Sequence, residues 1–281
     1  MNNTNTKRDA LIVAVASGKG GVGKTVSSIN LANSAVHNGK RVLLIDGDFG
    51  LANIDVVLGL QSRHNINDMV EQDLSIEDII LEGPFGIHLV PSASGISHLA
   101  NLSLAHKVKL AEELDKIKHK YDLIVIDAGA GIADNVIQLC NIAHEIVVVT
   151  TPEPHAITDA YALVKVLTTQ NHNDKINILV NQVLSTEQGA NIFSRLSDVS
   201  RKFLGVELNH VSSIPTDDSV KSGINCQRLL NESSIYSKSG HYYKEAYFNL
   251  VDNSSNRDRA DWRELINIPN AQRINMSQGE V

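Results

Sequence analysis

A glycine-rich stretch that directly follows an apolar run constrains the fold of this 281-residue chain more than any other feature. Residues 18–25 read GKGGVGKT and satisfy the pattern GxxxxGK[ST], and the apolar run Leu11–Ala16 precedes them. A loop of this kind, placed between a buried strand and a helix, cradles polyphosphate with converging backbone N–H groups. The sequence therefore predicts a P-loop that closes one end of a buried strand.

Short apolar runs alternate with helical patterns along most of the chain, which is typical of repeated βαβ units. Helices are predicted over about 104–117, 157–167 and 241–251, where apolar residues recur at helical spacing. The further runs that predict strands are Val42–Ile45, Ile87–Val90, Leu123–Ile126, Ile146–Thr150, Ile176–Val180 and Leu208–Ser213. This pattern predicts an α/β fold with a doubly wound, mostly parallel sheet and helices on both faces, the P-loop NTPase fold.

Composition and charge narrow the setting in which such a chain works. We expect a disordered N-terminus over residues 1–9, one P-loop ATPase domain over 10–252, and a tail or short helix over 253–281. The net charge of −7 argues against direct binding to nucleic acid. Cys140 and Cys226 form no CxxC pair, and no apolar leader is visible, so we expect a reduced, cytoplasmic protein.

The residues of the glycine-rich stretch divide the work of holding a nucleotide. Lys24 supplies a positive charge to the β- and γ-phosphates, and the Thr25 hydroxyl is a natural Mg²⁺ ligand. The helix that begins near Lys24 adds the positive end of its dipole. The nucleotide-binding set predicted here is Gly20, Gly21, Val22, Gly23, Lys24, Thr25 and Val26.

Carboxylates follow two of the predicted strands at the sheet edge where ligands bind in open α/β folds. Asp46 and Asp48 come after Val42–Ile45, and Asp127 comes after Leu123–Ile126. An aspartate that ends a buried strand beside a phosphate site is suited to hold Mg²⁺, which favours Asp127 in that role. Asp46 and Asp48 are two residues apart and share a face of an extended stretch, so that one can steady the metal's water shell while the other orients the attacking water.

The lysine at the start of the loop, Lys19, is not required by an ordinary P-loop. Its position leaves two interpretations open from the residues alone: a solvated loop lysine, or a lysine directed at a neighbouring molecule's nucleotide. With this lysine, KGGVGKT resembles the MinD/ParA class of deviant-Walker-A ATPases. Within the class, IDGDFGLANIDVVLGL at 45–60, IDAGAGI at 126–132 and PEPHAITDAYALVKVL at 152–167 resemble the flagellar number regulators known as FlhG or FleN.

The resemblance implies ATP and Mg²⁺ as cofactors, and an ATP-dependent homodimer that hydrolyses ATP slowly. Lys19 would cross the dimer to the partner's phosphates, much as an arginine finger does, so Lys19, Lys24 and Asp48 form the implied catalytic set. Asp48 would position the water, Asp46 would lie near the metal, and Asp127 would be the Walker B carboxylate beside the nucleotide. The implied metal set is Thr25, Asp46 and Asp127. Glu153 would lie where members of the class contact the partner's nucleotide.

The same resemblance places the base of the nucleotide. Asn181, directly after the strand run Ile176–Val180, would read adenine, and Pro215 and Asp217 would lie in the loop beside the base. Gly47 and Phe49 depart from the DADLG segment usual in the class, although both aspartates remain.

The implied function is a switch that limits flagellar number by binding an enhancer-binding transcription activator. Many relatives also stimulate an SRP-type GTPase through a DQAxxLR motif. That motif is absent here, which leaves the GTPase partner open. Two alternatives remain: a MinD-type membrane-cycling division-site ATPase and a ParA-type DNA partition ATPase.

The tail decides between the flagellar and the membrane-cycling alternatives only weakly. Trp262, Leu265 and Ile266 form one short apolar face, and neighbouring arginines could meet anionic lipid. The favoured interpretation is a segment packed on its own domain or a frayed end. Peripheral attachment at the inner face of the cell membrane or at a cell pole remains open.

Overall fold

The computed structural model describes residues 9–48, 53–92, 104–171, 176–231, 234–253 and 262. The stretch predicted to be disordered, 1–9, therefore lies outside the described residues except for Asp9. Most of the tail assigned to 253–281, and Phe49 of the departing segment, also lie outside them.

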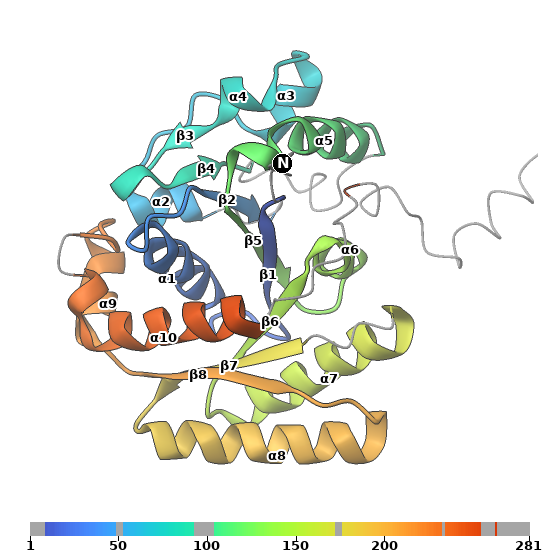
Figure 1. The fold of residues 1–281 in the computed structure, drawn as a ribbon, viewed down its shortest axis with the longest axis vertical. Helices are drawn as coiled ribbons and strands as arrows, with labels where there is room; N and C mark the ends of the chain where they lie inside the picture. Colours follow the sequence, from blue (N-terminus) through green and yellow to red (C-terminus); the bar gives the residue numbers. More distant parts are fainter. Residues whose placement is uncertain are drawn as a thin grey trace, which may run out of the picture.

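One mostly parallel sheet runs through the described part of the chain, with the strand order β3-β4-β2-β5-β1-β6-β7-β8 (Figure 1). Every neighbouring pair is parallel except β3 and β4. The strands are β1 (Leu11–Ser17), β2 (Val42–Gly47), β3 (Leu81–Glu82), β4 (His88–Val90), β5 (Leu123–Ala130), β6 (Glu145–Thr150), β7 (Ile176–Val183) and β8 (Asn209–Pro215). The predicted doubly wound α/β fold is confirmed, and each predicted strand is present.

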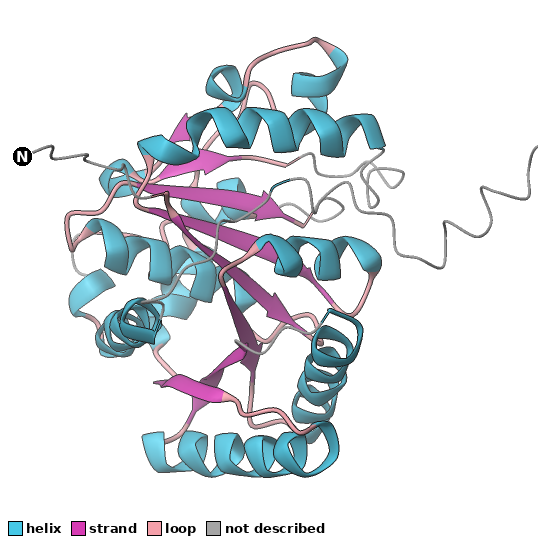
Figure 2. Cartoon of the chain, turned by 45° about the vertical axis from the view of Figure 1, so that its right-hand side comes forward, coloured by secondary structure: helices cyan, strands magenta, loops and turns pink. Residues whose placement is uncertain are grey.

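Helices cover both faces of this sheet (Figure 2). They are α1 (Lys24–Val36), α2 (Ile54–Leu58), α3 (Ile66–Glu71), α4 (Ile76–Ile79), α5 (Leu104–Ile117), α6 (Asp134–Ile142), α7 (Pro154–Asn171), α8 (Thr186–Leu204), α9 (Asp218–Asn225) and α10 (Lys238–Asn253). The three predicted helices correspond to α5, α7 and α10. No helix in the described ranges is long and apolar enough to cross a membrane.

Strand β1 shows why two layers of helices form. Successive side chains of a strand point to opposite faces. Leu11, Val13 and Val15 belong to the apolar cluster that contains α1 and α10, whereas Ile12 and Ala14 belong to the cluster with α5, α6 and α7. Because both sets are buried, the strand has to be apolar along its whole length.

Trp262, the chain's single tryptophan, lies in the second of these clusters. Its side chain is 2% exposed. This residue of the segment assigned to the tail is therefore packed on the domain, which agrees with the favoured interpretation of that segment.

Candidate nucleotide site

The P-loop connects β1 to α1 and has the backbone shape that only glycine adopts without strain. Gly21 and Gly23 have φ values of +82° and +88°, in the left-handed region. A Cβ on Gly23 would come within 2.2 Å of the Asn181 side-chain nitrogen, so this position also lacks room for any side chain. The glycine pattern of the sequence is thus explained by both backbone angle and close approach.

Strand register brings the acidic residues to the P-loop. β5 lies between β1 and β2, so that Asp127 pairs with Val15 on one side and with Asp46 on the other. The carboxyl ends of all three parallel strands therefore meet at one edge of the sheet. The carboxylates that the sequence predicted to lie together do so.

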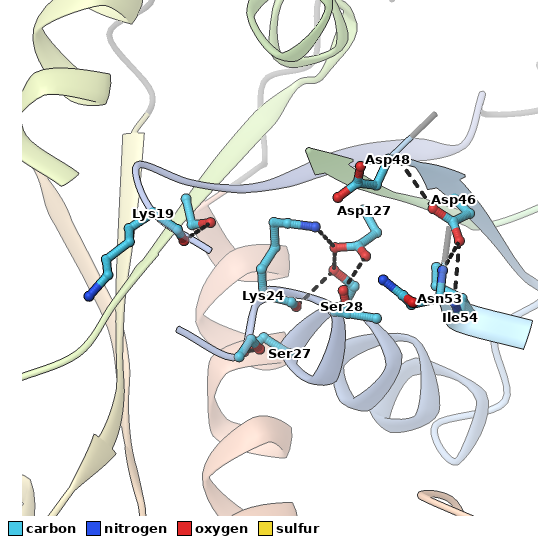
Figure 3. Close-up of polar contacts among 12 residues, drawn as sticks. Lys19, Lys24, Ser27, Ser28, Asp46, Asp48, Asn53, Ile54 and Asp127 are labelled. Atoms are coloured by element: carbon cyan, nitrogen blue, oxygen red, sulfur yellow. Dashed lines mark hydrogen bonds and ion pairs between the residues drawn. The ribbon is translucent and has the colours of Figure 1, made fainter. Parts of the chain in front are cut away.

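Asp127 binds the P-loop helix directly, as Figure 3 shows. Lys24 Nζ lies 3.0 Å from Asp127 Oδ1, and Thr25 Oγ1 donates to Asp127 Oδ2 at 2.7 Å. Ser28, one turn further along α1, donates its hydroxyl to Asp127 Oδ1 at 2.8 Å. Asp127 is 1% exposed and Lys24 is 7% exposed, so this is a buried ion pair with its remaining lone pairs satisfied.

The donor set around Asp127 fits a magnesium ion carried in with a nucleotide. Mg²⁺ in phosphate-transfer sites takes one or two protein oxygens, and the phosphates and water supply the rest. The Thr25 hydroxyl and the Asp127 carboxylate are adjacent oxygens of that kind. Among the described residues no group of three or more His, Cys, Asp or Glu side chains could hold a metal alone. Phosphate oxygens and water would complete the metal's shell.

Asp46, predicted as a metal ligand, binds backbone groups in the structure. Its carboxylate accepts hydrogen bonds from the N–H groups of Asp48, Asn53 and Ile54 at 3.1–3.2 Å. Burial raises the pKa of Asp46 to about 7, and the nearby charge of Asp127 adds to the rise, while these three hydrogen bonds oppose it. The carboxylate holds the start of α2 beside the end of β2, and its contact with a metal stays a prediction.

The cavity beside the P-loop has a volume of about 470 Å³. Ten of the predicted site residues line it: Gly20, Gly21, Gly23, Lys24, Thr25, Val26, Asp48, Asn181, Pro215 and Asp217. Asp127 lies beneath it against Lys24, and Val22 is buried behind it. Lys19, Asp46 and Glu153 do not line it.

Two of the polar residues that line the cavity have side chains fixed by hydrogen bonds. Asn181 donates from Nδ2 to the carbonyl of Val22 at 2.9 Å, which fixes the orientation of its amide. Asp217 caps α9 by accepting from Ser219 N and also accepts from Ser239 N, each at 2.9 Å. Burial acts to raise the pKa of Asp217, but the hydrogen bonds from Ser219 and Ser239 outweigh it and hold the pKa at about 2.

Lys19 lies in the P-loop yet outside the P-loop's own cavity. Its ammonium is directed away from Lys24 and Asp127 (Figure 3) and forms an ion pair with Glu153 at 3.0 Å. The side chains of Lys19 and Glu153 are 42% and 66% exposed. The resemblance placed Lys19 and Glu153 each at a partner's nucleotide. In the structure the two residues contact each other within one chain.

Several residues of the site carried no signal that the sequence reasoning used. Ser28 lies one helical turn after Lys24, a spacing that could have placed it beside Asp127. Tyr243 of α10 reaches the cavity from 216 residues away in the sequence, where it meets Ser27 at 3.2 Å. Thr216 lies in the loop predicted beside the base. The other lining residues without a prediction are Ser17, Asn53, Ala130, Gln182, Val220, Lys221, Ile224 and Ser239.

Comparison with known proteins agrees with this geometry. A family model described as an AAA domain matches residues 10–180. This match and the relatives described next agree with the P-loop, its leading lysine and the strand order. Together they show that the chain belongs to the MinD/ParA class of P-loop ATPases. The class uses ATP and Mg²⁺, and the residues around Lys24 and Asp127 are of the types that hold them.

Within this class the chain is similar to proteins of flagellar systems. It is 39% identical over 233 residues to the antiactivator FleN of Pseudomonas aeruginosa, which covers 83% of each chain. It is 33% identical over 232 residues to the flagellum site-determining protein YlxH of Helicobacter pylori, which covers 82% of this chain and 77% of that one.

One similar solved structure contains a bound nucleotide. The septum site-determining protein MinD of Pyrococcus horikoshii, complexed with Mg-ADP, is 25% identical with a TM-score of 0.71. The match covers 88% of this chain and 98% of that one.

Proposed function

We propose that this chain is an ATP-dependent dimerising switch with slow ATP hydrolysis, which limits flagellar number by binding an enhancer-binding transcription activator. Support for the flagellar role comes from similarity to an antiactivator and to a flagellum site-determining protein, each over more than four fifths of the chain. The switch itself is supported by the arrangement of residues around the cavity.

The position of Lys19 is the observation that carries the dimer. A lysine in a P-loop is close to phosphate, yet this ammonium does not line its own cavity and is accessible from outside. A second copy of the chain can therefore receive it across a shared face. A cation supplied in this way makes phosphoryl transfer depend on assembly, because the transition state gains charge stabilisation only in the dimer.

Asp48 supports the hydrolytic half of the cycle. It lines the cavity at the end of β2, next to the strand that carries Asp127. A carboxylate in this place can hold a water in line with the γ-phosphate, and hydrolysis would then return the dimer to monomers. Lys24, Thr25 and Asp127 hold the phosphates and Mg²⁺ throughout.

The direct test is size-exclusion chromatography with light scattering in Mg-ADP and in Mg-ATP, with the Asp48→Ala variant used to slow hydrolysis. We expect a monomer in ADP and a dimer in ATP. The purified activator of the host's flagellar genes should then co-elute with the ATP form and not with the ADP form. Deletion of the gene in a flagellated host should raise the number of flagella per cell.

The two alternatives make different predictions in simple assays. A membrane cycle would give ATP-dependent sedimentation with anionic liposomes, and a DNA partition ATPase would give salt-sensitive retention on nonspecific DNA. We expect neither, together with a cytoplasmic location. The SRP-type GTPase is tested by measuring its GTP turnover with and without the chain.

A further inference from the structure

Gln182 has a left-handed backbone conformation at a break in the pairing of two strands. It lies inside β7, and the pairing of β7 with β8 shifts register between Asn181 and Val183. Its φ is +57°, in the left-handed region that costs energy for a residue with a side chain. A bulge of this kind redirects a side chain at the edge of a site.

The redirected side chain of Gln182 lies in the nucleotide cavity. Gln182 lines this cavity and is exposed, although both of its neighbours in β7 are buried. Its amide nitrogen lies 3.8 Å from the position that a Cβ on Gly23 would take, so the amide reaches the last glycine of the P-loop.

The walls around this amide suit a purine ring. The apolar side chains that line the cavity include Pro215, Val220, Ile224 and Tyr243. Apolar side chains can cover the faces of a base, which leaves the polar edge of the base to hydrogen-bonding groups. Two carboxamide side chains of β7, those of Asn181 and Gln182, line the same cavity.

The orientation of the Asn181 amide is set by a hydrogen bond to the P-loop backbone. Its Nδ2 is committed to the Val22 carbonyl, which accepts and cannot donate. The oxygen of that amide is the acceptor that Asn181 can offer to a ligand. An oxygen there accepts from an exocyclic amine and repels a carbonyl.

We propose that Gln182 is a base-contacting residue that selects adenine over guanine, acting with Asn181. This proposal rests on the nucleotide site of the proposed function and adds the residue that determines base specificity. A carboxamide presents one donor beside one acceptor, which matches the N7 acceptor and the N6 amino group of adenine. Guanine presents two acceptors, N7 and O6, on the same edge, so one of its contacts is lost.

The experiment compares equilibrium binding of ribose-labelled fluorescent ATP and GTP analogues, which keep the base free. Gln182→Gly removes the amide and tolerates the left-handed backbone. Gln182→Glu keeps the length but replaces the donor, so it loses the bond to N7. Gln227→Gly is the matched control, because Gln227 has a φ of +54° but lies two residues after the end of α9 and does not line the cavity.

We expect Gln182→Gly and Gln182→Glu to weaken ATP binding about tenfold, the loss typical of one good base contact. GTP binding should change by less than about twofold, and Gln227→Gly should behave like the wild type for both nucleotides. Circular dichroism of each variant establishes that it is folded.

Other outcomes would overturn the inference in distinguishable ways. Wild-type ATP affinity in both Gln182 variants would show that the amide does not touch the base. Equal weakening of ATP and GTP would place Gln182 on the phosphates that both nucleotides share. Neither result would affect ATP-dependent dimerisation, whereas a wild-type protein that fails to dimerise would overturn the proposed switch and leave the base contact standing.

Discussion

Lys19 and Glu153 are 134 residues apart in sequence, and their side chains meet at 3.0 Å beside the nucleotide cavity. The pair stands in solvent, where the free energy gained by an ion pair is small, at about 0–1 kcal/mol. Lys19 therefore has a defined position in the single chain, and breaking its ion pair with Glu153 costs little free energy. This is what a residue needs if a second molecule is to take it up.

Lys19→Ala should leave ATP binding by the single chain within about twofold and the free energy of unfolding within about 1 kcal/mol, because the pair is exposed. Dimer formation in Mg-ATP should be lost, as measured by light scattering. Lys221→Ala is the control, since Lys221 is also an exposed lysine and does line the cavity. Normal dimerisation and turnover in Lys19→Ala would show that Lys19 is an ordinary loop lysine.

Asp48→Ala should bind ATP, dimerise and remain dimeric, because the water is no longer held in line. We expect turnover to fall at least about a hundredfold, with ATP affinity nearly unchanged, since a carboxylate does not attract phosphate. Chromatography over time in Mg-ATP provides the measurement. A monomeric variant, or wild-type turnover, would exclude Asp48 as the residue that positions the water.

Lys24→Ala should abolish ATP binding and also destabilise the nucleotide-free chain by about 3 kcal/mol, because Asp127 is left as a buried charge without its cation. The double variant Lys24→Ala/Asp127→Asn removes that charge. It should regain much of the stability in urea unfolding and still fail to bind ATP. A single variant as stable as the wild type would contradict the buried ion pair.

Asp217→Asn tests the carboxylate that links α9 to α10. Asparagine can still cap a helix but carries no titrating charge. Because the folded pKa is about 2 and the ordinary value is 3.8, the charge stabilises the fold above pH 4, and this contribution is lost as the pH falls towards 2. Partial exposure limits the contribution to about 1 kcal/mol.

Urea unfolding at pH 6 and at pH 3 measures this pH dependence. The wild type should lose more stability than Asp217→Asn between the two values. Asp218→Asn, which removes the same charge from a side chain that is 97% exposed, serves as the control. Equal losses in the wild type and Asp217→Asn would contradict the assigned role.

Trp262→Ala should lower the free energy of unfolding by about 3 kcal/mol, the usual cost of removing a large buried aromatic side chain. Trp262→Phe should cost less, because the indole nitrogen has no hydrogen-bond partner within the described part of the chain. Thermal unfolding followed by circular dichroism compares the two variants. An unchanged midpoint for Trp262→Ala would mean that Trp262 adds nothing to the domain's stability in solution.

Local signals predicted most of the fold and the phosphate half of the site. The glycines between Leu11–Ala16 and the helix of Lys24 indicate where the loop takes backbone angles that other residues avoid. This signal can be read directly from the sequence. Strand β5 and its terminal Asp127 follow from an apolar run that ends in a carboxylate. Register was not needed for these predictions, because adjacent parallel strands bring their carboxyl ends to one edge.

What could not be predicted depends on contacts between distant residues. The pair of Lys19 with Glu153 and the contact of Tyr243 with Ser27 join segments that share no local pattern. The backbone of Gln182 is set by the register shift between β7 and β8, which cannot be seen in either strand alone. Helix α8 was not among the predictions, although its buried apolar residues Ile192 and Leu196 are four positions apart, a spacing typical of a helix.

The ion pair of Lys24 with Asp127 has a consequence for how nucleotide binding is measured. Since the lysine already has a carboxylate partner, binding is an exchange reaction in which phosphate and its metal replace an internal ligand. The observed free energy of binding is therefore a difference between two strong associations, and it understates the strength of the contact between Lys24 and phosphate. The measured heat should be correspondingly small.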